Sequence, residues 1–131
     1  MMKLIKLGTS GIFIAIFFLL LLFPFQGLAK EIAKGVDVQV VTSYSPGIPG
    51  IKKINLIKFT MQPGAVLKDF PVKFNGLCNS TEGTISVVVQ GGKSDVYASG
   101  SRWLAEKGST VTLSNPGNVV HVHWVYQLVD G

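Results

Sequence analysis

Two histidines are the residues of this chain whose type and spacing most readily suggest chemistry. His121 and His123 are the only histidines, and they stand two residues apart in an apolar run near the end of the chain. Alternate residues of a strand point to one face, so both imidazoles would share a face. Imidazole pairs of this kind bind divalent metal ions, and Glu82 or the Cys78 thiol would supply a further ligand.

The apolar residues of the same segment argue against that metal site. Five large apolar residues alternate with the histidines, so we expect them to form the core side of the strand. They are Val120, Val122, Trp124, Tyr126 and Leu128. The histidines would then face outward beside valines that a second sheet or a second copy of the chain would cover. The sequence predicts a surface or interface pair, with a divalent metal at His121 and His123 as the alternative.

The other reactive groups are isolated along the chain. Cys78 is the only cysteine, which excludes an intramolecular disulfide framework and a clustered-cysteine zinc site. We expect its thiol to be buried as a small hydrophobe, because a nucleophilic cysteine needs a neighbouring base. No G-x-S-x-G, H-E-x-x-H or phosphate-loop motif occurs. No catalytic residue is therefore predicted, and a protein without enzymatic activity is favoured.

Composition narrows the function classes further. The chain has 131 residues, of which 47% are apolar and 15% charged, so it can bury a core and is not a disordered chain. Its formal net charge is +5, but the lysines are scattered and are not interleaved with aromatic residues. Nucleic-acid binding is therefore not expected.

Residues 1–29 have the three-part pattern of a secretory signal peptide. Two lysines precede an almost wholly apolar run over residues 11–25, and the small residues Gly27 and Ala29 suit a cleavage site. The run is shorter than the ~20 residues that a spanning helix needs. We therefore expect cleavage after Ala29, a mature domain of residues 30–131 without a membrane span, and an exported location, periplasmic or secreted. A retained amino-terminal anchor is the alternative.

The elements that must position these groups are strands. Short alternating runs are separated by Gly, Pro, Asn and Ser, and no helical period is sustained after residue 34. The expected strands cover residues 36–40, 54–61, 70–74, 85–89, 96–98, 103–104, 111–113 and 119–129. Pro71 lacks an amide hydrogen, so its strand is expected to be short or at a sheet edge. About eight short strands without helices predict an all-β fold, an antiparallel barrel or jelly roll.

Glycine spacing adds a family resemblance. Gly64 is followed by five residues, then Phe70-Pro71-Val72, three residues, Gly76, six residues and Gly83. This resembles the first motif of the cupin family, in which a glycine, a His-x-His pair, a glutamate and a second glycine keep these intervals. The stretch from Gly100 through Lys107-Gly108 and Val111 to Asn115 resembles the second motif, although its proline is absent. The resemblance covers residues 61–129 and implies a small single-domain cupin barrel.

The departures from the family carry the functional expectation. On this alignment the positions of the family's metal ligands hold Phe70, Val72, Gly76 and Val111, whose side chains cannot ligate a metal. The resemblance therefore implies a degenerate cupin without the metal cofactor. Its lumen would be apolar and would be plugged by Phe70 or open to an apolar ligand. The residues expected to line that lumen are Phe70, Val72, Phe74, Val111 and Leu113.

The sequence leaves three hypotheses of function open. The first is an exported, metal-free cupin-like module that binds an apolar small molecule or a partner protein and forms a homodimer. The second is a metal-dependent cupin enzyme, of the dioxygenase or isomerase type, with a relocated site at His121 and His123. The third is a membrane-tethered assembly subunit that keeps residues 1–29. The first residue of the purified chain separates the third hypothesis from the others.

Overall fold

Antiparallel strands build the part of the chain that the structure, a computed structural model, describes: residues 27–131. Within those residues there is no helix, and hence none long and apolar enough to cross a membrane. The expected signal peptide lies almost wholly outside the described residues, of which only Gly27, Leu28 and Ala29 belong to it. Cleavage after Ala29 and an exported location therefore stay predictions.

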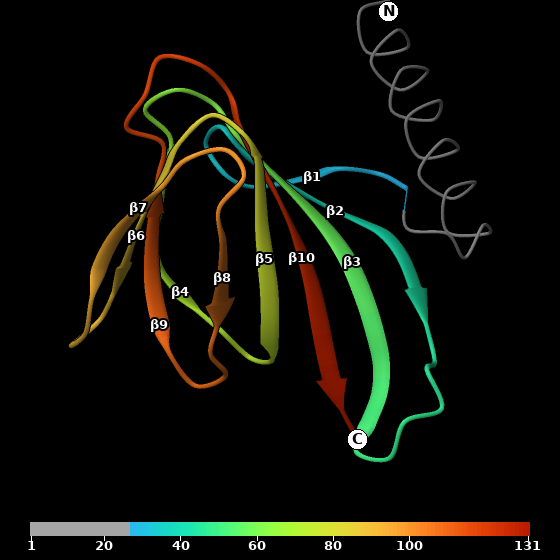
Figure 1. The fold of residues 1–131 in the computed structure, drawn as a ribbon. Helices are drawn as coiled ribbons and strands as arrows, with labels where there is room; N and C mark the ends of the chain where they lie inside the picture. Colours follow the sequence, from blue (N-terminus) through green and yellow to red (C-terminus); the bar gives the residue numbers. More distant parts are fainter. Residues whose placement is uncertain (1–26) are drawn as a thin grey trace, which may run out of the picture.

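The strands form two sheets that face each other (Figure 1). The six-stranded sheet has the order β1-β2-β3-β10-β5-β8. Its strands are β1 (Lys30–Ala33), β2 (Val36–Tyr44), β3 (Ile51–Met61), β10 (His121–Asp130), β5 (Asn75–Glu82) and β8 (Arg102–Ala105). The four-stranded sheet has the order β4-β9-β6-β7, with β4 (Val66–Pro71), β9 (Thr110–Ser114), β6 (Ile85–Val89) and β7 (Ser94–Tyr97). This all-β antiparallel jelly roll confirms the predicted fold class.

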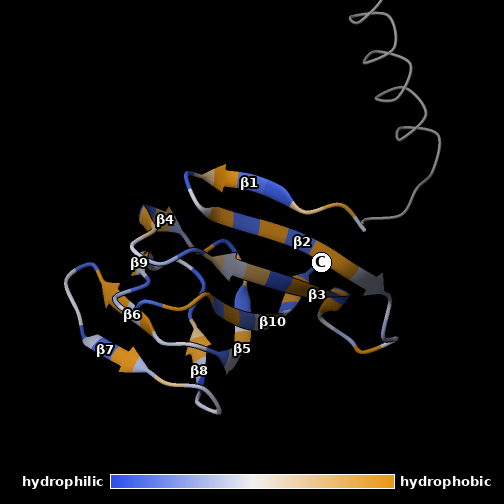
Figure 2. Ribbon diagram, turned by 90° about the horizontal axis from the view of Figure 1, so that it is seen from above, coloured by the Kyte–Doolittle hydropathy of each residue, from blue (hydrophilic) through white to orange (hydrophobic). Residues whose placement is uncertain are grey.

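The strands predicted over residues 36–40, 54–61, 85–89, 103–104 and 111–113 lie within observed strands, and β2 shows their alternation of polarity (Figure 2). The strand predicted over residues 70–74 was misplaced, because β4 begins at Val66 and ends at Pro71. Pro71 ends β4, which lies at an edge of its sheet, as its missing amide hydrogen predicted. Two strands were not expected, β1 and β5. Asn75 and Gly76 are of the residue types expected to separate strands, so a turn is predicted there, but this is wrong: they begin β5, which pairs with both β10 and β8.

Small inward-facing residues explain why β5 carries no strong strand signal. Gly76, Cys78 and Ser80 alternate toward the interior and are buried. A Cβ atom added at Gly76 would lie 2.7 Å from Cγ1 of Val125 on β10. The small residues leave room for the Val125 side chain of the neighbouring β10. They also deprive β5 of the branched residues by which strands are usually recognised.

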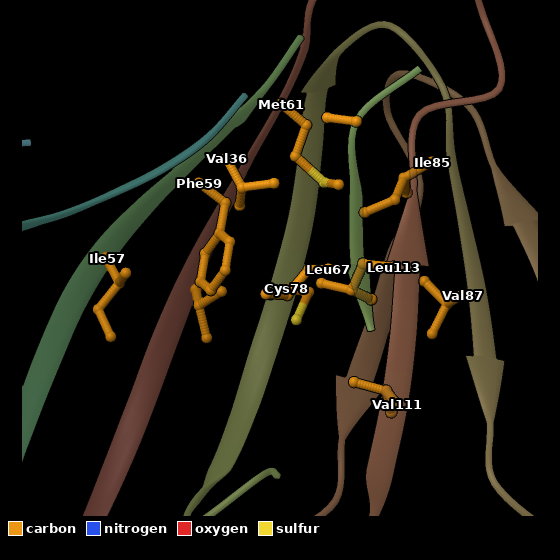
Figure 3. Close-up of a cluster of buried hydrophobic side chains, with 12 residues drawn as sticks. Val36, Ile57, Phe59, Met61, Leu67, Cys78, Ile85, Val87, Val111 and Leu113 are labelled. Atoms are coloured by element: carbon orange, nitrogen blue, oxygen red, sulfur yellow. The ribbon is translucent and has the colours of Figure 1, made fainter. Parts of the chain in front are cut away.

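The core lies between the two sheets, where inward-facing side chains from both meet (Figure 3). Its most deeply buried end, with side chains less than 2% exposed, is built from both apolar and polar residues. These are Met61, Ile85, His121, Val36, Asn115 and Ser80. Both polar atoms of the Asn115 side chain are hydrogen-bonded there. Its Nδ2 donates to the carbonyl oxygens of Met61 and Val119, and its Oδ1 accepts from the amide of Gly117. One buried amide thus fixes the turn that leads into β10.

The prediction that the histidines face outward was wrong. His121 is 0% and His123 2% exposed, whereas Tyr126 on the other face of β10 is 46% exposed. The register explains the reversal, since His121 pairs with Met61 and His123 with Phe59 of β3, both of which face the core. Neighbouring strands place paired residues on the same side of a sheet, so the buried face of β3 determines the buried face of β10.

Candidate ligand-binding site

A cavity of about 730 Å³ lies between the two sheets. The five residues that the sequence analysis placed in the lumen all line it: Phe70, Val72, Phe74, Val111 and Leu113. Their role in binding a ligand stays a prediction. Exposed charged side chains line its edge, namely Lys73, Lys93, Asp95 and Glu106. A largely apolar interior with a charged rim suits a small molecule that enters from water.

Aromatic rings form much of the cavity wall. Tyr97 and Trp103 are stacked, with centroids 4.4 Å apart and an interplanar angle of 6°. Phe59 and Phe70 meet edge to face at 6.3 Å. The sequence did not place Phe59, Tyr97 or Trp103 in the cavity, because the pairing of their strands could not be read from it.

A bulge in β4 turns Phe70 toward the cavity. Strict alternation from the buried Leu67 would point Phe70 to the opposite face. Asp69 interrupts the alternation with a positive φ of 51°, and the register with β9 shifts between Leu67 and Phe70. The amide of Asp69 donates to Oγ1 of Thr112 at 3.1 Å. Bulges often redirect a side chain beside a functional site, and this one places Phe70 opposite Val111.

The two histidines form a buried pair at the inner end of the cavity. Nε2 of His121 lies 2.8 Å from Nδ1 of His123, so one of these atoms carries a proton and donates it in a hydrogen bond to the other. The His123 ring stacks on Phe59 with centroids 4.7 Å apart and lies 5.3 Å from the Trp103 ring. His123 lines the cavity, whereas His121 does not. The Nδ1 atom of His121 is buried without a hydrogen-bond partner among the described residues.

Burial keeps both imidazoles neutral. Desolvation lowers the pKa of His121 to about 4, and the nearby backbone of Glu82 offsets this only in part. Desolvation and then the neighbouring His121 lower the pKa of His123 to about 3. The pair therefore presents uncharged polar atoms to its surroundings at neutral pH.

No protein-family model matches the sequence, and no curated protein matches it significantly. Solved structures do resemble the described fold. A predicted oxalate decarboxylase from Thermotoga maritima is 12% identical at a TM-score of 0.62, covering 81% of this chain and 94% of that chain. The CENP-C cupin domain of Drosophila melanogaster is 13% identical at 0.59, covering 76% and 71%. The polyketide cyclase RemF from Streptomyces resistomycificus is 13% identical at 0.59, covering 81% and 70%.

The chain has the cupin fold. At these identities the likeness shows the fold alone, and cupin folds carry different functions. The similar structures include two proteins named as enzymes, a decarboxylase and a cyclase, as well as the CENP-C domain. What this chain does has to be argued from its own cavity.

The donor groups in the described part of the chain do not form a cluster that fits a metal ion. Within residues 27–131, no three His, Cys, Asp or Glu side chains gather closely enough to hold one. The four positions that the resemblance aligned with metal ligands all line the cavity, but they hold Phe70, Val72, Gly76 and Val111. At Gly76 even a Cβ atom would meet Val125 at 2.7 Å, so a carboxylate could not replace the glycine without a shift of β10. At these four positions the cavity wall therefore presents apolar surface instead of metal ligands.

Cys78 and Ser80 of β5 are not activated as nucleophiles. Cys78 is buried, as predicted, and desolvation raises the pKa of its thiol to about 12. A thiol with this pKa is protonated at neutral pH and is a poor nucleophile. Ser80 pairs with His123 across the strands, but its Oγ makes no hydrogen bond within the described residues. Neither group is bonded to a base, as a covalent mechanism requires.

Proposed function

We propose that this chain is an exported, non-catalytic cupin domain that binds an apolar small molecule between its sheets. The observation that carries the proposal is the cavity of about 730 Å³ with its wall of aromatic and branched apolar side chains. Its volume falls in the range of small-molecule sites, roughly 300–1,000 Å³. Burial of an apolar ligand against these rings would supply the binding free energy.

The environment of the polar groups supports binding over catalysis. The histidines are neutral and hydrogen-bonded to each other, and the Cys78 thiol is protonated. The charged residues that line the cavity, such as Lys73 and Glu106, lie at its exposed edge. General acid–base catalysis needs a titrating group near the reacting atoms with a pKa close to the working pH. The inner wall supplies none in the described part of the chain.

A fluorescent apolar probe, N-phenyl-1-naphthylamine, tests the proposal directly. The wild-type protein should bind it saturably, and Val72→Asp should weaken binding at least tenfold because it places a carboxylate on the half-buried cavity wall. The matched control is Val96→Asp, since Val96 is 65% exposed and lies outside the cavity lining. Circular dichroism and thermal unfolding establish that each variant is folded. Equal binding by folded Val72→Asp, or no saturable binding by the wild type, would contradict the proposal.

The second hypothesis, a metal enzyme with His121 and His123 as ligands, makes a separate prediction. To bind a metal through their facing nitrogens, the rings would have to give up the hydrogen bond of 2.8 Å. Elemental analysis of protein purified without an affinity tag or chelator measures the metal content. Near-stoichiometric iron, zinc, nickel or manganese would favour the enzyme. Absence of metal, with none taken up on addition, would favour the apolar ligand.

A further inference from the structure

His123 is a buried polar residue that lines the cavity, and its second ring nitrogen, Nε2, makes no hydrogen bond to a described residue. From its position we infer that Nε2 of His123 is the hydrogen-bonding anchor for the hydroxyl group of a flat aromatic ligand, such as a phenol or a naphthol. This inference rests on the proposed function and adds the chemical class of the ligand. The depth of His123, its hydrogen-bonding capacity and the shape of its surroundings support it.

The order of residues along β10 shows how deep in the cavity His123 lies. His123, Val125 and Gln127 line the cavity in succession, whereas His121 beyond them is fully buried and does not. Gln127 pairs with Gly76 at the beginning of β5, near the exposed edge, while His123 pairs with Ser80 farther along that strand. A ligand that fills the cavity therefore brings one end to the His123 ring.

One nitrogen of the His123 ring, Nε2, is available for a further hydrogen bond. The bond to His121 occupies Nδ1 of His123, and no described residue bonds Nε2. His123 lines the cavity, and a polar atom of a buried ring is costly unless a ligand or water satisfies it. A hydroxyl group both donates and accepts, so it can pair with Nε2 whichever ring nitrogen carries the proton. Because burial keeps the imidazoles uncharged, a neutral hydroxyl is favoured over a carboxylate.

The surrounding rings give the shape of the ligand body. Phe59 lies parallel to the His123 ring at an angle of 11°, and Trp103 approaches it at 54°. Trp103 is itself stacked on Tyr97. Flat faces in several orientations favour an aromatic body, which gains stacking or edge-to-face contacts beyond its buried area.

Two naphthalenes of nearly equal size test the anchor. The wild-type protein should bind 2-naphthol about tenfold more tightly than 2-methylnaphthalene, because one hydrogen bond to a buried polar atom is typically of that strength. If neither compound binds, the proposed function fails. If both bind with equal affinity, the cavity binds apolar ligands but His123 is not the anchor, and this inference is overturned.

Variants then assign the preference to a residue. His123→Phe should lose the preference for 2-naphthol over 2-methylnaphthalene, because its ring offers no hydrogen-bonding atom. The matched control is Gln127→Leu, which removes the other polar side chain that β10 contributes to the cavity and should keep the preference. Loss of the preference in Gln127→Leu alone would move the anchor to Gln127 and overturn the inference.

A measurement on the unaltered protein covers the case in which His123→Phe does not fold. Imidazole ¹⁵N resonances distinguish Nε2 from Nδ1 in each histidine. Saturation with 2-naphthol should shift Nε2 of His123, and 2-methylnaphthalene should shift it much less. An unchanged Nε2 resonance at saturation with 2-naphthol would overturn the inference.

Discussion

At the scale of single residues, the histidine pair is the main polar feature of an apolar interior. His121 is sealed from water and His123 nearly so, and each ring is held by the other. The cost of keeping them buried depends on protonation, because only the neutral rings fit. The pair should therefore make the stability of the fold sensitive to acid.

Stability should fall as the pH drops below 6.5, the ordinary histidine value. Folded-state pKa values near 4 for His121 and 3 for His123 lie below the unfolded value of 6.5. The unfolded chain thus takes up protons that the folded chain cannot, so the contribution is fully present above pH 6.5 and is lost toward pH 4 and pH 3. The loss is roughly 1.4 kcal/mol per histidine for each pH unit below 6.5. Urea unfolding at pH 7.5 and pH 5 measures the difference.

The doubly substituted variant His121→Leu/His123→Phe serves as the control for this prediction. It removes the titrating groups from both states, so its free energy of unfolding should change little between pH 7.5 and pH 5. The lowered pKa of the exposed Asp130, which bonds to Lys107, acts at lower pH and does not affect this window. Parallel pH dependences in the wild type and the variant would contradict the prediction.

At the scale of elements, the bulge in β4 links backbone geometry to the cavity. Asp69 is the one residue other than glycine with a positive φ in the described part of the chain. This conformation is open to glycine, acceptable for aspartate and costly for branched side chains. The conformation of one exposed residue thus directs Phe70 into the binding wall.

The effect of a substitution at Asp69 on stability should therefore depend on how well the new residue tolerates a positive φ. Asp69→Val should lower the free energy of unfolding by roughly 1–2 kcal/mol, and Asp69→Gly should be close to neutral. Asp69→Val should also weaken binding of N-phenyl-1-naphthylamine, because a relaxed bulge turns Phe70 away. Lys68→Val is the matched control, since Lys68 is exposed on the same strand without a positive φ. Equal destabilisation at positions 68 and 69 would argue against this role.

The comparison of β4 and β9 with β5 and β10 shows what the sequence could predict. Around Phe70 and along β9 the apolar residues alternate clearly in the sequence, so Phe70, Val72, Val111 and Leu113 were placed toward the interior. The bulge at Asp69, which shifts the pairing of β4, was not visible in that pattern. In β5 the inward residues are small, so alternation did not identify the strand. In β10 both faces carry apolar or aromatic residues, so alternation did not identify which face is buried. Only the register with β3 places His123 inside. The cavity wall was thus partly predictable, whereas its polar anchor depended on strand pairing.

At the scale of the whole molecule, the buried and exposed faces of β10 are the opposite of those expected, so a different surface is left for a partner to cover. The outer face of the six-stranded sheet carries a row of large apolar side chains across three paired strands. Leu104 of β8 is 58% exposed, Leu77 of β5 48% and Tyr126 of β10 46%, and the three are consecutive partners in the sheet. Apolar rows of this kind commonly mark a contact surface. The homodimer expected from the sequence remains a prediction, now directed to this face.

The molar mass in solution tests that prediction. Light scattering should give twice the chain mass at micromolar concentration, because two copies can bury the row in an isologous sheet-to-sheet contact. Leu77→Lys and Tyr126→Lys should each shift the mass toward the monomer, since each places an ammonium group in the contact. Val96→Lys, on the exposed β7 of the other sheet, is the control and should leave the dimer intact. A wild-type mass of one chain at every concentration would exclude the homodimer, and equal dissociation by Val96→Lys would move the contact away from this face.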